Sequence, residues 1–109
     1  MSVTHHFQLS YSVEPIDQSK GALHAANLVR DELSNVPIEG WTGVEGLPGV
    51  ITGCLELADG VGPALRQEAQ STLEHALREI LRSQGASFDV RVAALVMVDR
   101  LGPSMSLQI

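Results

Sequence analysis

The segment FDVRVAALVMV, residues 88–98, constrains the fold more than any other part of the sequence. Every second residue from Phe88 onward is apolar, which is the two-residue period of a strand with one buried face. The intervening positions begin with two charged residues and continue with three apolar ones, Ala93, Leu95 and Met97. This pattern predicts a sheet with one covered face, and it indicates that the other face also carries apolar side chains that need a cover.

The N-terminal third of the chain begins with alternating polar and apolar residues and continues with a helical pattern of apolar residues. Residues 6–14 alternate between polar and apolar types, which predicts a half-buried strand, and Pro15 ends it because proline cannot donate to a sheet ladder. The following residues, up to about Leu33, repeat small apolar side chains at helical spacing. We expect a helix there, capped by Asp17 or Ser19, that lies close to a flat surface.

The middle of the chain, residues 35–62, is rich in glycine and proline and predicts a hairpin. We expect a short strand at residues 41–44, a turn at 45–49 and a second strand at 50–57. Trp41 is expected to fill the edge of the core, and the alternative is an exposed tryptophan that anchors a partner.

The clearest helical pattern begins at Pro63, a residue that suits a first helical position, and ends just before Gly85, which suits the position past a helix end. Its apolar residues recur at three- and four-residue spacing and make one stripe that faces the core. The strand 88–98 follows, with Phe88 on its buried side. Residues 105–109 alternate as well and allow a short fifth strand.

The expected order is strand, helix, strand, strand, helix, strand, with the short fifth strand as an addition. This order matches the split βαβ arrangement called ferredoxin-like, an α+β fold in which two helices cover one face of a four-stranded antiparallel sheet. A chain of 109 residues has the usual size of one domain, so residues 1–109 are expected to form a single α+β domain. Many unrelated functions share this fold, and the fold alone predicts none of them.

The composition argues against several classes of function. Seven basic residues against thirteen acidic ones give a formal net charge of −6, which repels phosphate backbones, so we expect no nucleic acid partner. No stretch is apolar enough for a membrane helix and the N-terminal segment has no signal-peptide pattern, so we expect a cytoplasmic protein with no membrane partner. The single cysteine, Cys54, excludes an internal disulfide and a multi-cysteine zinc site.

Leu95 and Met97 give the sequence's main indication of function, because apolar side chains on an uncovered sheet face are best explained by something that covers them. One hypothesis is a second copy of the chain, packed sheet against sheet or exchanging its terminal strand, since two-fold homodimers are the commonest assemblies. The candidate interface residues are Arg91, Ala93, Leu95, Met97, Met105 and Leu107. The alternative is that residues 101–109 of the same chain fold back over Leu95 and Met97.

The catalytic candidates rest on residue types and on the expected strand pairing. Cys54 is a nucleophile if a base lies beside it, and His6 and Glu56 are expected on the same open face of the sheet. No sequence signature of a cysteine enzyme surrounds Cys54. A free cysteine is more often a small buried residue, and this interpretation of Cys54 is preferred.

The remaining histidines and the glycine-rich DGVGP segment indicate no metal and no cofactor. His5 and His6 are strand neighbours and point to opposite faces, while His24 and His75 lie on different expected helices, so no metal site is expected. Residues 59–63, DGVGP, precede a helix but lack the spacing and the lysine of a phosphate-binding loop. We interpret them as a plain loop and helix cap, and we expect no cofactor.

Taken together, these patterns favour a small assembly or binding module whose open sheet face mediates homodimerisation and the binding of another protein. The alternative is a small-molecule enzyme for proton transfer or isomerisation, or a ligand-binding protein, with a pocket over the same face of a dimer. The lack of a recognisable catalytic motif favours the first function.

Overall fold

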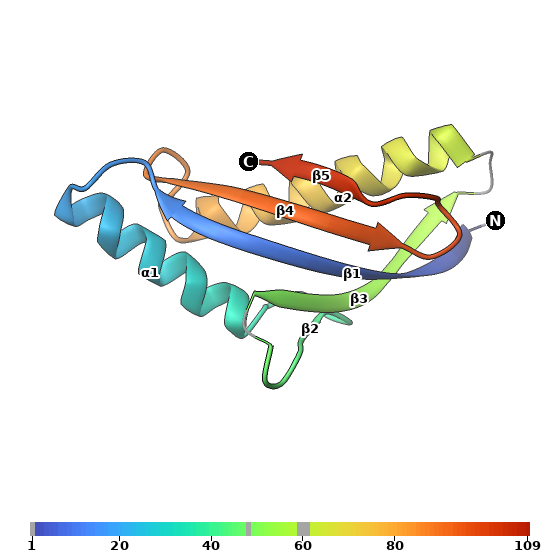
Figure 1. The fold of residues 1–109 in the computed structure, drawn as a ribbon, viewed down its shortest axis with the longest axis horizontal. Coiled ribbons are helices and arrows are strands. Elements are labelled where there is room, and N and C mark those ends of the chain that lie inside the picture. The colour runs from blue at the N-terminus through green and yellow to red at the C-terminus, as the bar shows by residue number, and fades with distance from the viewer. Residues whose placement is uncertain (1, 48, 59–61) are drawn as a thin grey trace.

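The computed structural model describes residues 2–47, 49–58 and 62–109, which form five strands and two helices (Figure 1). In chain order these are β1 (Ser2–Pro15), α1 (Lys20–Ser34), β2 (Thr42–Gly43), β3 (Val50–Ala58), α2 (Gly62–Ser83), β4 (Val90–Val98) and β5 (Met105–Gln108). The molecule is elongated, with extents of 46 × 26 × 22 Å. The α+β class expected from the sequence is confirmed.

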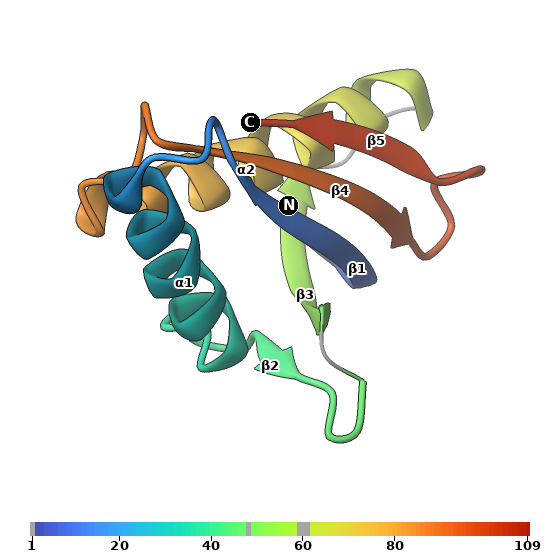
Figure 2. The ribbon, with the colours of Figure 1, turned by 60° about the vertical axis from the view of Figure 1, so that its left-hand side comes forward.

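All five strands join in one antiparallel sheet in the order β2-β3-β1-β4-β5 (Figure 2). The central strand is β1, which pairs with β3 along one edge and with β4 along the other. On one side His6 is the cross-strand partner of Cys54, and on the other Ser10 is the partner of Leu95. The N-terminal strand therefore brings together the candidate residues from distant parts of the chain.

The sheet has five strands, the fifth being the short C-terminal strand that the sequence allowed, and the four-stranded ferredoxin-like order is not matched. The difference arises at the C-terminus, where β5 pairs with β4 at the edge of the sheet. Arg66 on α2 holds the connection between these two strands, because its guanidinium donates to the backbone oxygens of Leu101 and, at 2.7 Å, Pro103. Met105 and Leu107 on β5 are buried, so the added strand widens the core.

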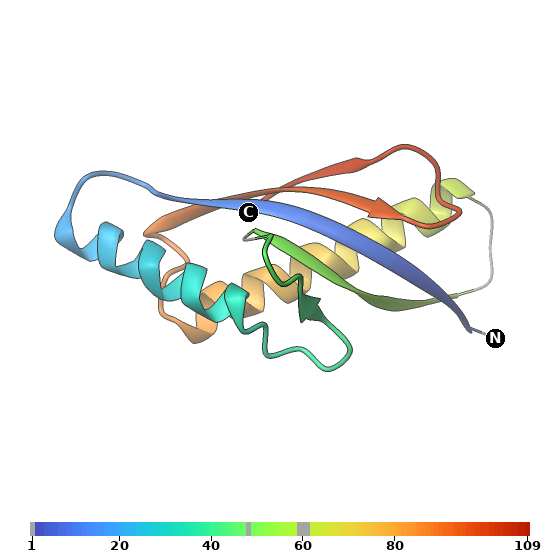
Figure 3. The same cartoon turned by 60° about the horizontal axis from the view of Figure 1, so that its bottom comes forward.

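Both helices lie on the same side of the sheet (Figure 3). The side chains that point to this side are the apolar members of the alternating patterns, and Phe7, Leu9 and Val13 on β1 are all buried. α1 packs mainly against β1, whereas α2 packs against β3 and β5. Within the described residues no helix covers the opposite side, which we call the open face.

The N-terminus of α1 is fixed by side chains that the sequence had marked as caps. Ser19 is the N-cap, and its hydroxyl accepts from the backbone N–H of Ala22 at 3.2 Å. Asp17 accepts in turn from the backbone N–H of Ser19 at 2.9 Å. Small side chains on the buried face allow this helix to lie close to the sheet; these residues are Ala22, Ala25, Ala26, Val29 and Leu33.

α2 also follows the sequence pattern closely. Gly85, just past its end, has φ 65°, a left-handed conformation that glycine adopts without a steric penalty. One stripe of the helix packs into the core, formed by Ala69, Leu73, Leu77, Ile80 and Leu81. The pattern of four-residue and three-residue steps therefore identified the buried face correctly.

Phe88 was expected on the buried side of the last long strand, and this prediction is wrong. Its side chain is 89% exposed. β4 begins only at Val90, and Phe88 lies in a turn closed by a hydrogen bond from the N–H of Asp89 to the oxygen of Ala86, at 3.0 Å. The alternating pattern continues for two residues into this turn, where the backbone no longer has the pleat that orients side chains.

Phe7 and Trp41 close the core beside β2. Their ring centroids are 4.8 Å apart at an interplanar angle of 69°, an edge-to-face contact, and Trp41 is buried as expected. Gly53 on β3 lies against both rings. A Cβ atom at this position would be 2.7 Å from Cε1 of Phe7 and 2.9 Å from Cδ1 of Trp41, so only glycine fits here without displacing a ring.

The variant Gly53→Ala is therefore expected to lower the free energy of unfolding by about 1–3 kcal/mol, the usual cost of overpacking a core. Urea denaturation followed by circular dichroism measures this change. The matched control is Gly21→Ala on α1, where a Cβ atom meets nothing within 4 Å and alanine is expected to stabilise the helix by roughly 0.5–1 kcal/mol. Equal stability of the two variants would contradict the described packing.

Candidate functional site

The open face is built from the outward side chains of four strands. Their character changes across the sheet, from polar on β1 to mixed on β3 and β4. The members are Thr4, His6, Gln8, Ser10, Ser12 and Glu14 from β1, Thr52, Cys54 and Glu56 from β3, Arg91, Ala93, Leu95 and Met97 from β4, and Ser106 and Gln108 from β5.

Leu95 and Met97 are exposed on this face to 48% and 59%. The alternative that residues 101–109 fold back over these two side chains is wrong. That segment turns beside the end of β4 and continues as β5 in the plane of the sheet, so it lies next to Leu95 and not above it. The two apolar side chains remain uncovered in the single chain.

Two members of the candidate interface belong to the core of their own chain. Met105 and Leu107 are buried, because the alternation along β5 turns them toward the helices and turns Ser106 and Gln108 toward the open face. In the single chain, β5 pairs with its own β4. The candidate surface is thereby reduced to the outward residues of β4, which are Arg91, Ala93, Leu95 and Met97.

The cross-strand neighbours of Leu95 are short and uncharged. Ser10 on β1 and Ser106 on β5 flank Leu95 as cross-strand partners, and Ser12 flanks Ala93 in the same way. Short side chains lose little conformational entropy when they are buried, and they leave the sheet accessible to another flat surface. The middle of the open face is therefore suited to packing against a second sheet.

His6 and Cys54 are in contact on the open face. The distance from Nδ1 of His6 to Sγ of Cys54 is 3.2 Å. Cys54 is exposed, so the preferred interpretation of this residue as a small buried side chain is wrong: the alternation along β3 buries Leu55 and turns Cys54 outward. A thiol in contact with an imidazole can pass its proton to the ring, which makes this pair a candidate nucleophile and base.

Glu56, the third catalytic candidate, lies on the same face but has a different partner. The hydroxyl of Thr4 donates to its carboxylate oxygen Oε1. Among the described residues no side chain bonds the second ring nitrogen of His6, so the pair lacks the orienting group of a catalytic triad. The structure thus places His6, Cys54 and Glu56 on one face, as expected, but brings only the first two into contact.

A shallow cavity of about 480 Å³ adjoins the thiol. Its walls include the His6 and Cys54 side chains, Gln8 and Thr52 from the sheet, and Gly40 and Thr42 from the segment around β2. The open shape gives small reagents direct access to Sγ of Cys54.

The other histidines are separated from this pair. His5 is buried on the helix side of the sheet, with Nδ1 at 3.0 Å from the backbone oxygen and 3.4 Å from the carboxylate of Asp99, a contact that no sequence pattern indicated. His24 and His75 are exposed on α1 and α2. In the part of the chain that the structure describes, no three His, Cys, Asp or Glu side chains are grouped to hold a metal ion.

Residues 59–61 of the DGVGP segment lie outside the described residues, and its interpretation as a loop and cap stays a prediction. Across the described ranges, neither helix has the length and apolar character needed to cross a membrane. No family model, curated protein or solved structure matches this chain. The site is therefore interpreted from its own geometry.

The contact between His6 and Cys54 predicts how fast the thiol reacts. At neutral pH, iodoacetamide is expected to alkylate wild-type protein several-fold faster than the His6→Gln variant, because the imidazole can accept the thiol proton. Cys54 is the only cysteine, so the intact mass of the chain reports its reaction alone. His75→Gln, which removes an exposed histidine on α2, is the control. Equal rates for wild type and His6→Gln would show that the imidazole does not act as a base.

Proposed function

We propose that the open face binds a second copy of the chain, so that two sheets pack face to face around a two-fold axis. The observation that carries this proposal is the exposure of Leu95 and Met97, at 48% and 59%, in a sheet whose other face is filled by helices. Removing apolar surface from water contributes about 25 cal/mol per Å² to the free energy of association. About half of each side chain is still exposed to water in the single chain.

The order of residues along β4 supports a second copy as the partner. Suppose that the two-fold axis crosses β4 at Leu95. Each outward residue of β4 then lies opposite a residue of the partner's β4, one that is equally far from Leu95 but in the other direction along the strand. Ala93 then faces the partner's Met97. A small side chain therefore meets a large one on either side of the axis.

The order along β1 agrees with the same axis. Ser10 is the cross-strand partner of the central leucine, so it would lie at the axis too. Glu14 then faces the partner's His6, and Ser12 faces the partner's Gln8. None of these pairs brings two like charges together, so this surface is complementary to itself.

The size of the surface predicts a weak dimer. Three strands about 4.8 Å apart, over about eight residues at about 3.4 Å each, span roughly 400 Å² in projection. Stable interfaces bury about 800 Å² of accessible surface per partner. The proposed contact covers about half of this area in projection, so we expect a weak dimer that dissociates in the micromolar range.

We also infer that the fold is a five-stranded variant of the ferredoxin-like arrangement. The succession of strands and helices up to β4 and the position of β1 between β3 and β4 support this interpretation. β5 is then an addition at the edge that widens the sheet. A wider sheet with both helices on one side gives the dimer a larger flat surface.

A second candidate function is thiol chemistry on a small molecule, and the 3.2 Å contact between His6 and Cys54 favours it. The residues would act as base and nucleophile, with the adjoining cavity as the way in for the substrate. The dimer is preferred because the pair has no orienting group among the described residues, and because the cavity is shallow. The alkylation experiment above separates an activated thiol from an ordinary one.

The variant Leu95→Asp tests the proposed dimer. At the two-fold axis it would bring two carboxylates face to face, so the dimer should dissociate at least tenfold more readily than that of the wild type. Sedimentation velocity over a concentration series measures the fraction of protein at twice the chain mass of 11.7 kDa.

The matched control is Leu23→Asp. Leu23 is similarly exposed, at 41%, but it lies in the first turns of α1, away from the open face and where an added carboxylate is tolerated. This variant should dimerise like the wild type. A wild-type chain that stays at 11.7 kDa up to millimolar concentration, or a Leu95→Asp dimer as tight as that of the wild type, would refute the proposal.

A further inference from the structure

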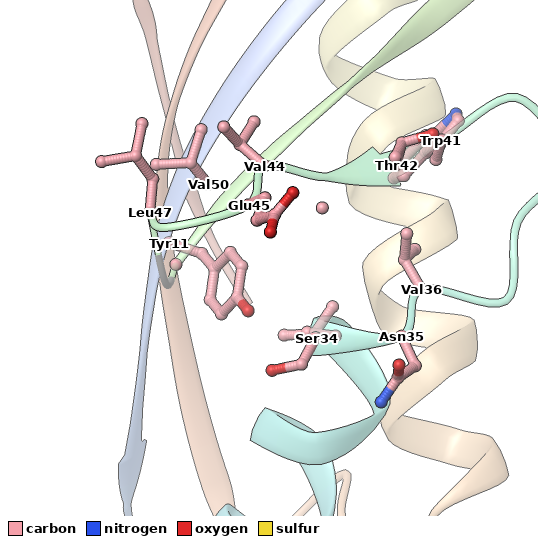
Figure 4. Close-up of a pocket in the computed structure, with 13 residues that line it drawn as sticks. Tyr11, Ser34, Asn35, Val36, Trp41, Thr42, Val44, Glu45, Leu47 and Val50 are labelled. Atoms are coloured by element: carbon pink, nitrogen blue, oxygen red, sulfur yellow. The ribbon is translucent and has the colours of Figure 1, made fainter.

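A second cavity, of about 530 Å³, lies between the end of α1 and the segment around β2 (Figure 4). It is separate from the apolar pair on β4. Sequence patterns did not reveal it, because its walls combine residues of β1, α1, β2 and β3 with loop residues from distant parts of the chain. A volume of this size is typical of sites for small molecules. Tyr11 forms one side of the cavity, and the carboxylate of Glu45 projects into the space beside the tyrosine ring.

Hydrogen-bond acceptors lie at the α1 end of this cavity. The hydroxyl of Ser34 donates to the backbone oxygen of Arg30 at 2.9 Å, so its remaining lone pairs can accept. The backbone oxygen of Ser34 receives no backbone hydrogen bond in the described part of the chain, and it lies 3.3 Å from the position that a Cβ atom of Gly43 would occupy. These groups are at the C-terminus of α1, which carries the negative end of the helix dipole.

Tyr11 adds a neutral hydroxyl. Burial raises the pKa of Tyr11 above its ordinary value of 10.0. Because the pKa is raised, the phenol keeps its proton throughout the neutral range and adds no charge to the cavity. Glu45 is therefore the one ionisable group with a charge at neutral pH among the residues that line the cavity in the described chain.

The surrounding sequence has a single sign of charge. Residues 31–65 contain six carboxylates and no lysine, arginine or histidine. Such a region attracts cations and repels anions. Apolar side chains complete the cavity wall, including Val36, Leu47 and Val50, so a ligand with a short hydrocarbon chain has contacts as well.

We infer that this cavity binds a small organic cation, a protonated primary amine with a short apolar chain. The ammonium group donates to the carboxylate of Glu45 and to the oxygens of Ser34, while the hydrocarbon chain lies along Val36 and Val50. The inference does not depend on the dimer, since none of the exposed apolar residues of β4 lines this cavity.

The probe for the test is n-hexylammonium chloride, titrated at neutral pH and followed by amide and indole NMR shifts of the labelled protein. We expect saturable shifts at the end of α1, at β2 and at the indole of Trp41, which is the only tryptophan, with a dissociation constant in the low millimolar range. The Glu45→Gln variant should weaken binding about tenfold, because it removes the charge and keeps the shape.

Three controls decide the outcome. The variant Glu39→Gln removes an exposed carboxylate that does not line the cavity, and it should bind like the wild type. Hexanoate should give no saturable shift, and hexanol should bind much more weakly than hexylammonium. Equal binding of hexylammonium and hexanol, saturable binding of hexanoate, or unchanged affinity in Glu45→Gln would each overturn the inference.

Discussion

One constraint governs this molecule: side chains alternate along a strand, and both helices cover the same side of the sheet. The apolar rows of β1, β3 and β4 fill one side, so every residue between them faces outward. This single partition buries Leu55, exposes Cys54 and leaves Leu95 and Met97 uncovered. The contact between Cys54 and His6 and the apolar surface on β4 are thus two results of the same arrangement.

The sequence predicted those parts of the fold in which periodicity decides the structure. The five segments of regular pattern became strands and helices close to their expected bounds, and Ser19 and Gly85 mark helix ends as cap residues do. The assignment of His6, Glu56, Leu95 and Met97 to the open face also holds, because a two-residue period fixes the face once the buried row is known.

The features that the sequence did not predict lie where an alternating pattern ends, or where the structure depends on contacts between residues far apart in the sequence. Phe88 continues the alternation of β4 but lies in a turn, and the edge pairing of β5 determines which way Met105 and Leu107 point. The cavity near Tyr11 depends on how a glycine-rich loop approaches the end of α1, and no local pattern encodes that approach. The thiol and imidazole contact required the register between β1 and β3, which a single sequence does not specify.

The most direct test of the open face as a docking surface for a second copy is methyl NMR on protein labelled at its methionine methyl groups, diluted from millimolar to low micromolar concentration. Met97 lies on the open face and Met105 lies in the core, so one chain contains both the reporter and its control. We predict that the Met97 signal shifts with concentration while the Met105 signal stays fixed. A Met97 signal that does not move over the whole range would contradict the account.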